Sequence, residues 1–186
     1  MTHDRRHERG TALLELALTL PMLLGMLMIG SELGFLIHDR LIVTNVSREG
    51  GSLASRMTVI DPAFLNLLTA GAKPLPIAGP NGRVYVTRIT SGTTDTDTQP
   101  HVTTTLTEGG LAVASAVGAR QANMGLPESI YERLVYNADN GTADIAEVTV
   151  VEVYYKHRPV TPLQRFMPTL LLTDGDGTIL RSKAIF

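Results

Sequence analysis

The chain contains no cysteine and no tryptophan, and aromatic residues make up only 5% of it. Without cysteine it has no disulfides, no thiolate metal ligands and no cysteine nucleophile. With so few aromatic side chains it offers few surfaces on which nucleic-acid bases stack. Its 16 Lys and Arg residues are matched by 18 Asp and Glu residues, so no overall basic field attracts a phosphate backbone. These absences argue against nucleic acid as a partner.

Motifs of known chemistry are equally scarce in the 186 residues. None of the five histidines belongs to an HExxH or similar metal-binding pair, and we expect most of them at the surface. The segment 78–83, AGPNGR, lacks the Lys-Ser or Lys-Thr of a phosphate loop, and there is no GxSxG elbow. Asp174 and Asp176 suggest a calcium loop, but its twelfth position is Ile185 instead of Glu, which favours a plain turn over 173–178. The sequence therefore predicts no enzyme, no metal and no cofactor.

Apolar residues are concentrated near the N-terminus. From Thr11 to Ile37 the only formal charges are those of Glu15 and Glu32. At about 1.5 Å per residue a helix of this length reaches roughly 40 Å, which exceeds the roughly 30 Å of a hydrocarbon core. We therefore predict a transmembrane helix over residues 11–37, surrounded by a lipid bilayer.

Charge does not orient this helix. Three arginines lie in the leader 1–10 and three in the segment 38–57, so the positive-inside rule is balanced. Because the leader is short, we expect it to stay in the cytoplasm while the long C-terminal portion is exported. A cleaved secretory signal is the alternative, but the apolar run is longer than the roughly 7–15 residues of a signal core, and no Ala-x-Ala site ends it.

Glu15 is the unusual residue of this helix, because a carboxylate in a bilayer usually has a partner or a function. No cation follows it by three or four residues, where Leu18 and Thr19 stand. Cleavage after Gly10 would create an α-amino cation at Thr11, four residues before Glu15. That cation could pair with the Glu15 carboxylate of its own or of a neighbouring subunit.

The pattern RGTALLELALTLPMLLGMLMIGSELG resembles the start of type IV pilin-like proteins, and more closely that of the TadE-like family, the pseudopilins or minor pilins of tight-adherence (Flp) pilus systems. The resemblance covers residues 5–56. A weaker one covers VTVVEVYYKHRPVTPL at 148–163, which is similar to a strand and Pro motif near the end of TadE-like domains. Major Flp pilins are very short and usually carry Tyr after the glutamate, whereas this longer chain has Leu16, so the resemblance indicates a minor component.

The resemblance also implies roles for single residues. Gly10 and Thr11 match the bond cut by a prepilin peptidase. Glu15 matches the glutamate required for processing or assembly, and Pro21 matches the proline of the family's helix. The implied partners are the peptidase, other Tad minor pilins, the Flp pilin and an inner-membrane secretion platform. The implied location is the bacterial inner membrane, with a single pass, the C-terminal domain in the periplasm or on the exported face, and possible incorporation into the pilus.

Three further residues of the helix are candidates for packing. Gly30 and Gly34 form a GxxxG pattern that lets a second helix approach closely. Glu32 lies between them near the outer end of the span, where it either pairs with another membrane subunit or snorkels toward the interface. Pro21 lacks an N–H group and implies a kink or a local opening of the helix.

Beyond the span we predict an exported helix extension over 38–57 and an exported domain over 58–186. In the extension an apolar stripe of helical spacing continues, and the Gly50-Gly51 pair leaves open a bend or an early end. The members of the stripe are Ile42, Val46, Leu53 and Met57.

The exported domain reads as α+β, with short helices and a small, mainly antiparallel sheet, as in pilin-like architectures. A short helix is expected over 61–71, with Asp61 as its N-cap. Strands are expected over 83–90, 101–107, 145–157 and 178–186, of which 145–157 is the central one, and the order of the strands does not follow. The segment 111–125 is ambiguous. The polar loop at 93–98 is expected to be solvated, with adhesion or glycan contact as the weaker alternative.

The sequence leaves one competing class of function. In that class the helix is a mere tether for a periplasmic binding domain or an unrecognised hydrolase. Replacement of Glu15 by alanine separates the two classes, because only a pilin-like protein needs this carboxylate.

Overall fold

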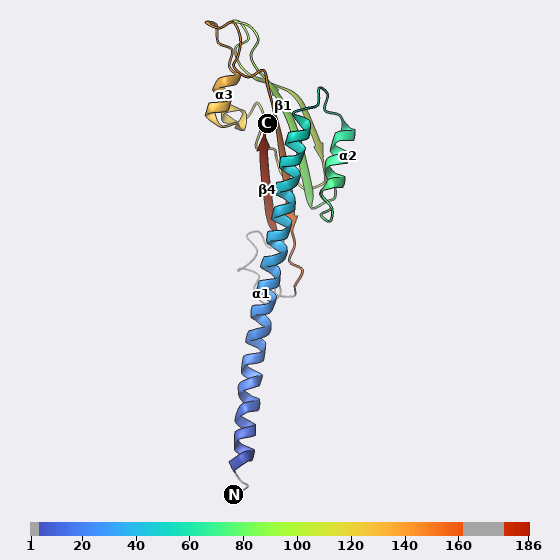
Figure 1. Cartoon of the computed structure of the whole chain (residues 1–186), viewed down its shortest axis with the longest axis vertical. Coiled ribbons are helices and arrows are strands. Elements are labelled where there is room, and N and C mark those ends of the chain that lie inside the picture. Colours follow the sequence, from blue (N-terminus) through green and yellow to red (C-terminus); the bar gives the residue numbers. More distant parts are fainter. Residues whose placement is uncertain (1–3, 162–176) are drawn as a thin grey trace. The chain divides into compact units, whose positions relative to one another are not determined.

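The computed structural model describes residues 4–161 and 177–186, with side chains from Thr11 onward. In these ranges the element order is α1 (Asp4–Ala54), α2 (Pro62–Gly71), β1 (Gly82–Thr90), β2 (His101–Glu108), the 3-10 turn η1 (Ala122–Gly125), α3 (Glu128–Leu134), β3 (Glu147–His157) and β4 (Thr178–Ile185) (Figure 1). The predicted α+β class is confirmed, with a long apolar N-terminal helix followed by a domain with a four-stranded antiparallel sheet. The turn predicted over 173–178 lies largely outside the described residues.

The described chain divides into two compact units. One comprises Met1–His38 together with Arg158–Thr178, and the other comprises Asp39–His157 together with Ile179–Phe186. The helix α1 contributes to both. The sheet belongs to the larger unit, apart from Thr178 at the start of β4.

The sheet of the larger unit has the strand order β2-β1-β3-β4. Both neighbours of β1 are antiparallel to it, and Val86 lies opposite Leu106 on one side and Val151 on the other. Thr149 of β3 and Phe186 after β4 exchange both backbone hydrogen bonds, at 2.8 and 3.0 Å, as an antiparallel pair does. The strand at 145–157 is internal, as predicted from its β-branched and aromatic residues.

The two faces of the sheet bury different partners, and Figure 1 shows α2 and α3 on opposite sides of it. On one face a cluster that includes Ile89, Val148 and Val150 packs against residues from 117–134. On the other face Arg88 contacts the end of α1. Because alternate residues of a strand point to opposite faces, a sheet covered on both sides needs strands that are apolar almost throughout, and β3 is buried from Val148 to Tyr154.

Local signals explain the short elements. Asp61 is the N-cap of α2, as predicted, and its carboxylate accepts a hydrogen bond of 3.0 Å from the Phe64 amide. The ambiguous segment 111–125 is mostly irregular and ends in η1. The helix α3 was not predicted as a separate element, although Pro127 and Glu128 at its start are typical helix-initiating residues.

The C-terminal part of α1 belongs to the larger unit, and its buried face differs from the predicted stripe. Val46 is buried, but Leu53 is 47% exposed and Met57 is 37% exposed, so these two predicted stripe positions were wrong. The buried positions are instead mostly small, namely Val43, Val46, Ser47, Gly50, Gly51 and Ala54. Small residues let this part of α1 lie close to its neighbours, which is why a purely apolar pattern missed the face.

Candidate functional site

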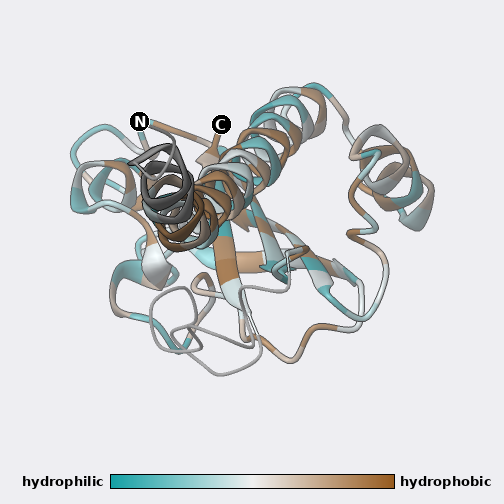
Figure 2. Cartoon of the chain, turned by 90° about the horizontal axis from the view of Figure 1, so that it is seen from below, coloured by the Kyte–Doolittle hydropathy of each residue, from teal (hydrophilic) through white to brown (hydrophobic). Residues whose placement is uncertain are grey.

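The N-terminal half of α1 carries an exposed apolar surface. Ten large apolar side chains between Leu13 and Leu27 are at least half exposed. Figure 2 shows the hydrophobic colouring along this part of the helix. Among the described residues, α1 is the one helix long and apolar enough to cross a membrane. Water disfavours so much exposed apolar surface, which makes this helix a candidate membrane anchor.

Glu15 is exposed on this helix, one turn after Thr11. Its backbone carbonyl accepts a hydrogen bond of 2.9 Å from the Thr19 hydroxyl. No hydrogen bond or ion pair of the Glu15 carboxylate is found within the part of the chain that the structure describes. Because an acidic side chain at the centre of a bilayer costs roughly 2.5–3.5 kcal/mol on insertion scales, this charge needs a partner from elsewhere or a position near the surface.

Pro21 lies within α1, and the helix continues through it. Its missing N–H group leaves the carbonyl of Ala17 without its usual helical donor. Gly30 and Gly34 are exposed, and a Cβ atom built on either would have no neighbour within 4 Å. The close-approach surface expected of a GxxxG pattern is therefore open on the described part of this chain.

Glu32 has partners that the sequence did not suggest. Its side chain is only 2% exposed, and its carboxylate accepts hydrogen bonds from the backbone amides of Val160, at 3.1 and 3.2 Å, and Thr161, at 3.0 Å. Residues two apart on a helix point about 200° apart, so this carboxylate faces away from the side of Gly30 and Gly34. No local signal reveals such a contact, because its two halves are separated by about 128 residues.

In the larger unit, Arg88 of β1 binds the C-terminal end of α1. Its guanidinium donates hydrogen bonds to the carbonyls of Thr58 at 2.6 Å, Met57 at 2.5 Å and Ala54 at 3.2 Å. Glu147 lies 3.9 Å from its Nε atom. Ala54 is the last residue of α1, and Met57 and Thr58 follow it, so this buried arginine of the sheet binds both the last helical carbonyl and the turn that ends the helix.

A buried carboxylate holds the irregular segment against the sheet. Glu152 of β3, 1% exposed, accepts hydrogen bonds from the Ser115 hydroxyl, the Ala116 amide at 3.1 Å and the Tyr154 hydroxyl at 2.9 Å. Burial, and then the charge and hydrogen bond of Glu152, raise the pKa of Tyr154 to about 12. The phenol therefore stays protonated and keeps donating at neutral pH.

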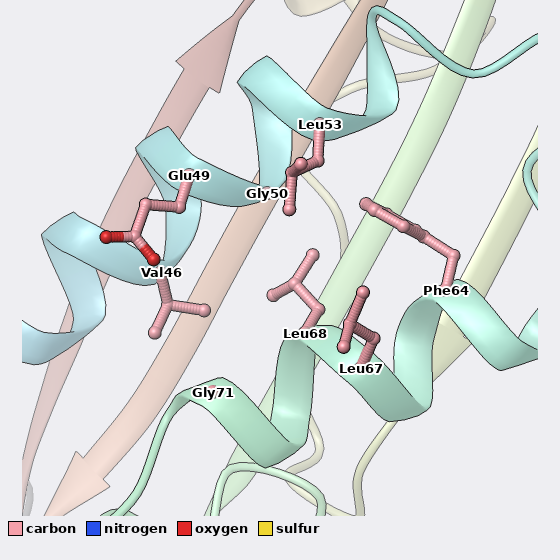
Figure 3. A pocket seen from close by; sticks show the side chains of 8 residues that line it. All are labelled: Val46, Glu49, Gly50, Leu53, Phe64, Leu67, Leu68 and Gly71. Carbon is pink, nitrogen blue, oxygen red and sulfur yellow. The ribbon is translucent and has the colours of Figure 1, made fainter.

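An apolar pocket of about 200 Å³ lies between the end of α1 and α2 (Figure 3). Its lining residues are Val46, Glu49, Gly50, Leu53, Phe64, Leu67, Leu68 and Gly71. Leu68 points toward Gly50, where a Cβ atom would overlap the leucine side chain. Glu49 is the single ionisable residue among them, so the pocket holds no acid–base pair or nucleophile for a reaction.

Other sequence expectations concern histidines, metals and loops. His38 and His101 are exposed, whereas His157 is buried and lies 2.7 Å from the Asp39 carboxylate. Among the described residues no three His, Asp or Glu side chains gather as metal ligands. Asp174 and Asp176 lie outside the described residues. The 93–98 loop is largely exposed.

A long apolar helix followed by an α+β domain defines a class, that of proteins with a candidate N-terminal membrane anchor. A family model described as TadE-like protein matches residues 10–52, which confirms the resemblance inferred from the sequence for this segment. No curated protein and no solved structure matches the chain. The TadE-like segment supports a general minor-pilin-like role associated with a Tad pilus, in a family of structural proteins.

Proposed function

We propose that this protein is a minor pilin or pseudopilin that serves assembly of a tight-adherence (Flp) pilus. Residues 11–37 anchor it in the bacterial inner membrane, and the chain from 38 onward lies on the exported face. A prepilin peptidase removes the leader 1–10 by cutting after Gly10. The observation that carries this proposal is that the TadE-like match begins at Gly10, immediately before the exposed apolar surface of α1.

The role proposed for Glu15 follows from its place on α1. Cleavage after Gly10 leaves an ammonium group on Thr11, four residues before the carboxylate. Side chains four apart lie on the same side of a helix, so a cation at this end of the helix is within reach of Glu15 of the same chain or of a neighbour. The charge that the bilayer disfavours is then neutralised as the subunit assembles with other minor pilins and the Flp pilin on the secretion platform.

The test is to determine the N-terminal sequence and the intact mass of the protein recovered from the membranes of its own cells, with and without the peptidase. We expect a chain that begins at Thr11 only when the peptidase is present. Replacing Gly10 by valine should leave the leader attached, whereas the matched change Gly25→Val in the same helix should not. A start at Met1 in the presence of the peptidase, or a start beyond Ile29, would contradict the proposal.

Glu15→Ala tests the pilin-like role beyond the cut. We expect it to block processing or pilus assembly, and the neighbouring change Leu16→Ala to leave both intact. The readouts are the mass of the recovered chain and the amount of sheared surface pili. If Glu15→Ala is silent in both, the helix is a tether and the competing class of binding domain or hydrolase gains support.

Packing of α1 against a second membrane helix belongs to the same proposal. The open faces of Gly30 and Gly34 support it, and Pro21 shapes the same helix. We expect Gly34→Ile to weaken association between labelled copies, or with labelled Flp pilin, as measured by energy transfer in membranes. Phe35→Ile is the control, because Phe35 points about 100° away from Gly34 and about 140° away from Gly30 around the helix, and it should leave association unchanged.

A further inference from the structure

The buried carboxylate of Glu32 raises the question of what surrounds it when α1 is in a membrane. It accepts hydrogen bonds from two successive backbone amides, those of Val160 and Thr161. Successive amides that converge on one anion are a common protein device for binding negative charge. Here the anion is a side chain of the same chain, and it is only 2% exposed.

The depth of Glu32 follows from helix geometry. From Thr11 to Ser31 the helix spans 21 residues, which at about 1.5 Å each is roughly 31 Å, the thickness of a hydrocarbon core. Glu32 therefore stands where the chain leaves the hydrocarbon. Beyond it Leu33, Phe35 and Ile37 are still about half exposed, so apolar surface that suits lipid continues past the level of the carboxylate.

The segment 158–161 must reach the same level, because its amides are bonded to Glu32. The bonds satisfy the carboxylate and the two amides together, which removes much of the cost of bringing irregular backbone to a lipid boundary. Val160 is 69% exposed and apolar, and Arg158 is exposed and cationic. An apolar side chain beside a cation suits the interface, where apolar groups meet acyl chains and arginine meets phosphate.

We propose that segment 158–161, held by Glu32, is a second membrane-contacting element, which lies in the interfacial layer on the exported side with Val160 against lipid. The inference rests on the membrane anchorage in the proposed function but not on cleavage after Gly10. It assigns the buried Glu32 a role as the positioning residue of this element.

The chain contains no tryptophan, so a single introduced tryptophan reports its own surroundings. The full-length variants Val160→Trp, Leu23→Trp and Val59→Trp are reconstituted in vesicles of phosphatidylcholine and phosphatidylglycerol, with and without brominated acyl chains. Leu23 is 62% exposed within the span, and Val59 is 70% exposed after the end of α1. We expect blue-shifted emission and bromine quenching at position 160, weaker than at 23 and clearly above the background at 59.

Each other outcome overturns the inference. Quenching of the tryptophan at position 23 but not of the one at position 160 overturns the inference about segment 158–161, while the membrane anchor remains supported. Blue-shifted emission at 160 without quenching shows that protein, not lipid, covers Val160. Absence of quenching at 23 overturns the anchorage and with it the proposed function.

Variants of Glu32 test its positioning role. In the Val160→Trp background, Glu32→Leu removes the acceptor of both amides but keeps α1 apolar, so quenching at 160 should be lost. Glu32→Gln keeps a carbonyl acceptor and should retain most of the quenching. A Leu23→Trp, Glu32→Leu double variant that is still quenched shows that α1 remains inserted. Full quenching at 160 in Glu32→Leu would overturn the role of Glu32.

Discussion

The imidazole Nδ1 of His157, at the end of β3, lies 2.7 Å from a carboxylate oxygen of Asp39 on α1. The two side chains are 4% and 13% exposed, so water replaces neither partner easily. This pair ties the last residue of a central strand to the helix on which the domain is carried.

Removal of Asp39 is predicted to destabilise the larger unit. In Asp39→Ala the buried imidazole Nδ1 loses the carboxylate oxygen that lies 2.7 Å from it, and the loss of such a buried partner costs about 1–3 kcal/mol. Urea unfolding of the full chain in detergent micelles, followed by circular dichroism, measures this loss. His101→Ala, at an exposed histidine, is the control and should change the free energy of unfolding little. Equal stability of Asp39→Ala and the unmodified chain would contradict the prediction.

Arg88 is predicted to be needed for the end of α1. Arg88→Met keeps much of the apolar stem but removes the guanidinium donor of the Met57 and Thr58 carbonyls, whereas the Ala54 carbonyl keeps the Met57 amide, and the loss should cost about 1.5–3 kcal/mol. Arg88→Lys should recover only part of this, because an ammonium group lacks the fork that reaches several carbonyls. The same urea assay applies, with Arg48→Met at an exposed position of α1 as the control. Full recovery by lysine would show that charge alone suffices.

Gly50 is predicted to be a close-packing position. A leucine here would collide with Leu68, since even a Cβ atom would overlap that side chain. We expect Gly50→Leu to lower the free energy of unfolding by about 1–3 kcal/mol, despite the better helix propensity of leucine. Gly71→Leu, where a Cβ atom meets nothing within 4 Å, is the matched control and should not destabilise the unit. Equal effects at both positions would contradict the packing argument.

The raised pKa of Tyr154 predicts that the free energy of unfolding depends on pH. Its pKa is raised to about 12 from 10.0, so the folded state holds the phenol proton where the unfolded state has already lost it. The stabilisation is complete below about pH 10 and is lost as pH rises toward about 12. Between about pH 10 and pH 12, the free energy of unfolding should fall more steeply for the unmodified chain than for Tyr154→Phe, and below pH 10 the two slopes should agree. Tyr136→Phe should follow the unmodified chain, and identical slopes for all three would refute the assignment.

Much of the candidate site could be predicted from the sequence. The span after Gly10, the charge of Glu15 and the small pair Gly30 and Gly34 are local patterns, and the TadE-like match covers the same residues. The contacts of Glu32 could not be predicted, because they depend on where the chain returns after β3. From the sequence we expected this carboxylate to pair with another membrane subunit or to snorkel toward the membrane interface. In the structure it accepts hydrogen bonds from backbone amides of its own chain.

At the Gly50-Gly51 pair, tertiary packing outweighs the low helix propensity of glycine. Glycine inside a helix costs about 1 kcal/mol relative to alanine, which is why a bend or an early end was left open. The helix nevertheless continues to Ala54. Leu68 and Phe186 occupy the space where the two Cβ atoms would be, so glycine is the residue that fits at both positions.

Sequence alone determined the apolar helix, its charged exceptions, the N-cap at Asp61 and the positions of four strands, since each rests on neighbouring residues and on the periodicity of helix or strand. Only the tertiary structure decided the strand order β2-β1-β3-β4, the capping of α1 by Arg88, and the burial of Glu32, Glu152 and His157. These depend on residues far apart in the chain. A buried polar side chain is tolerated only where folding brings it a partner, and no local pattern records that partner.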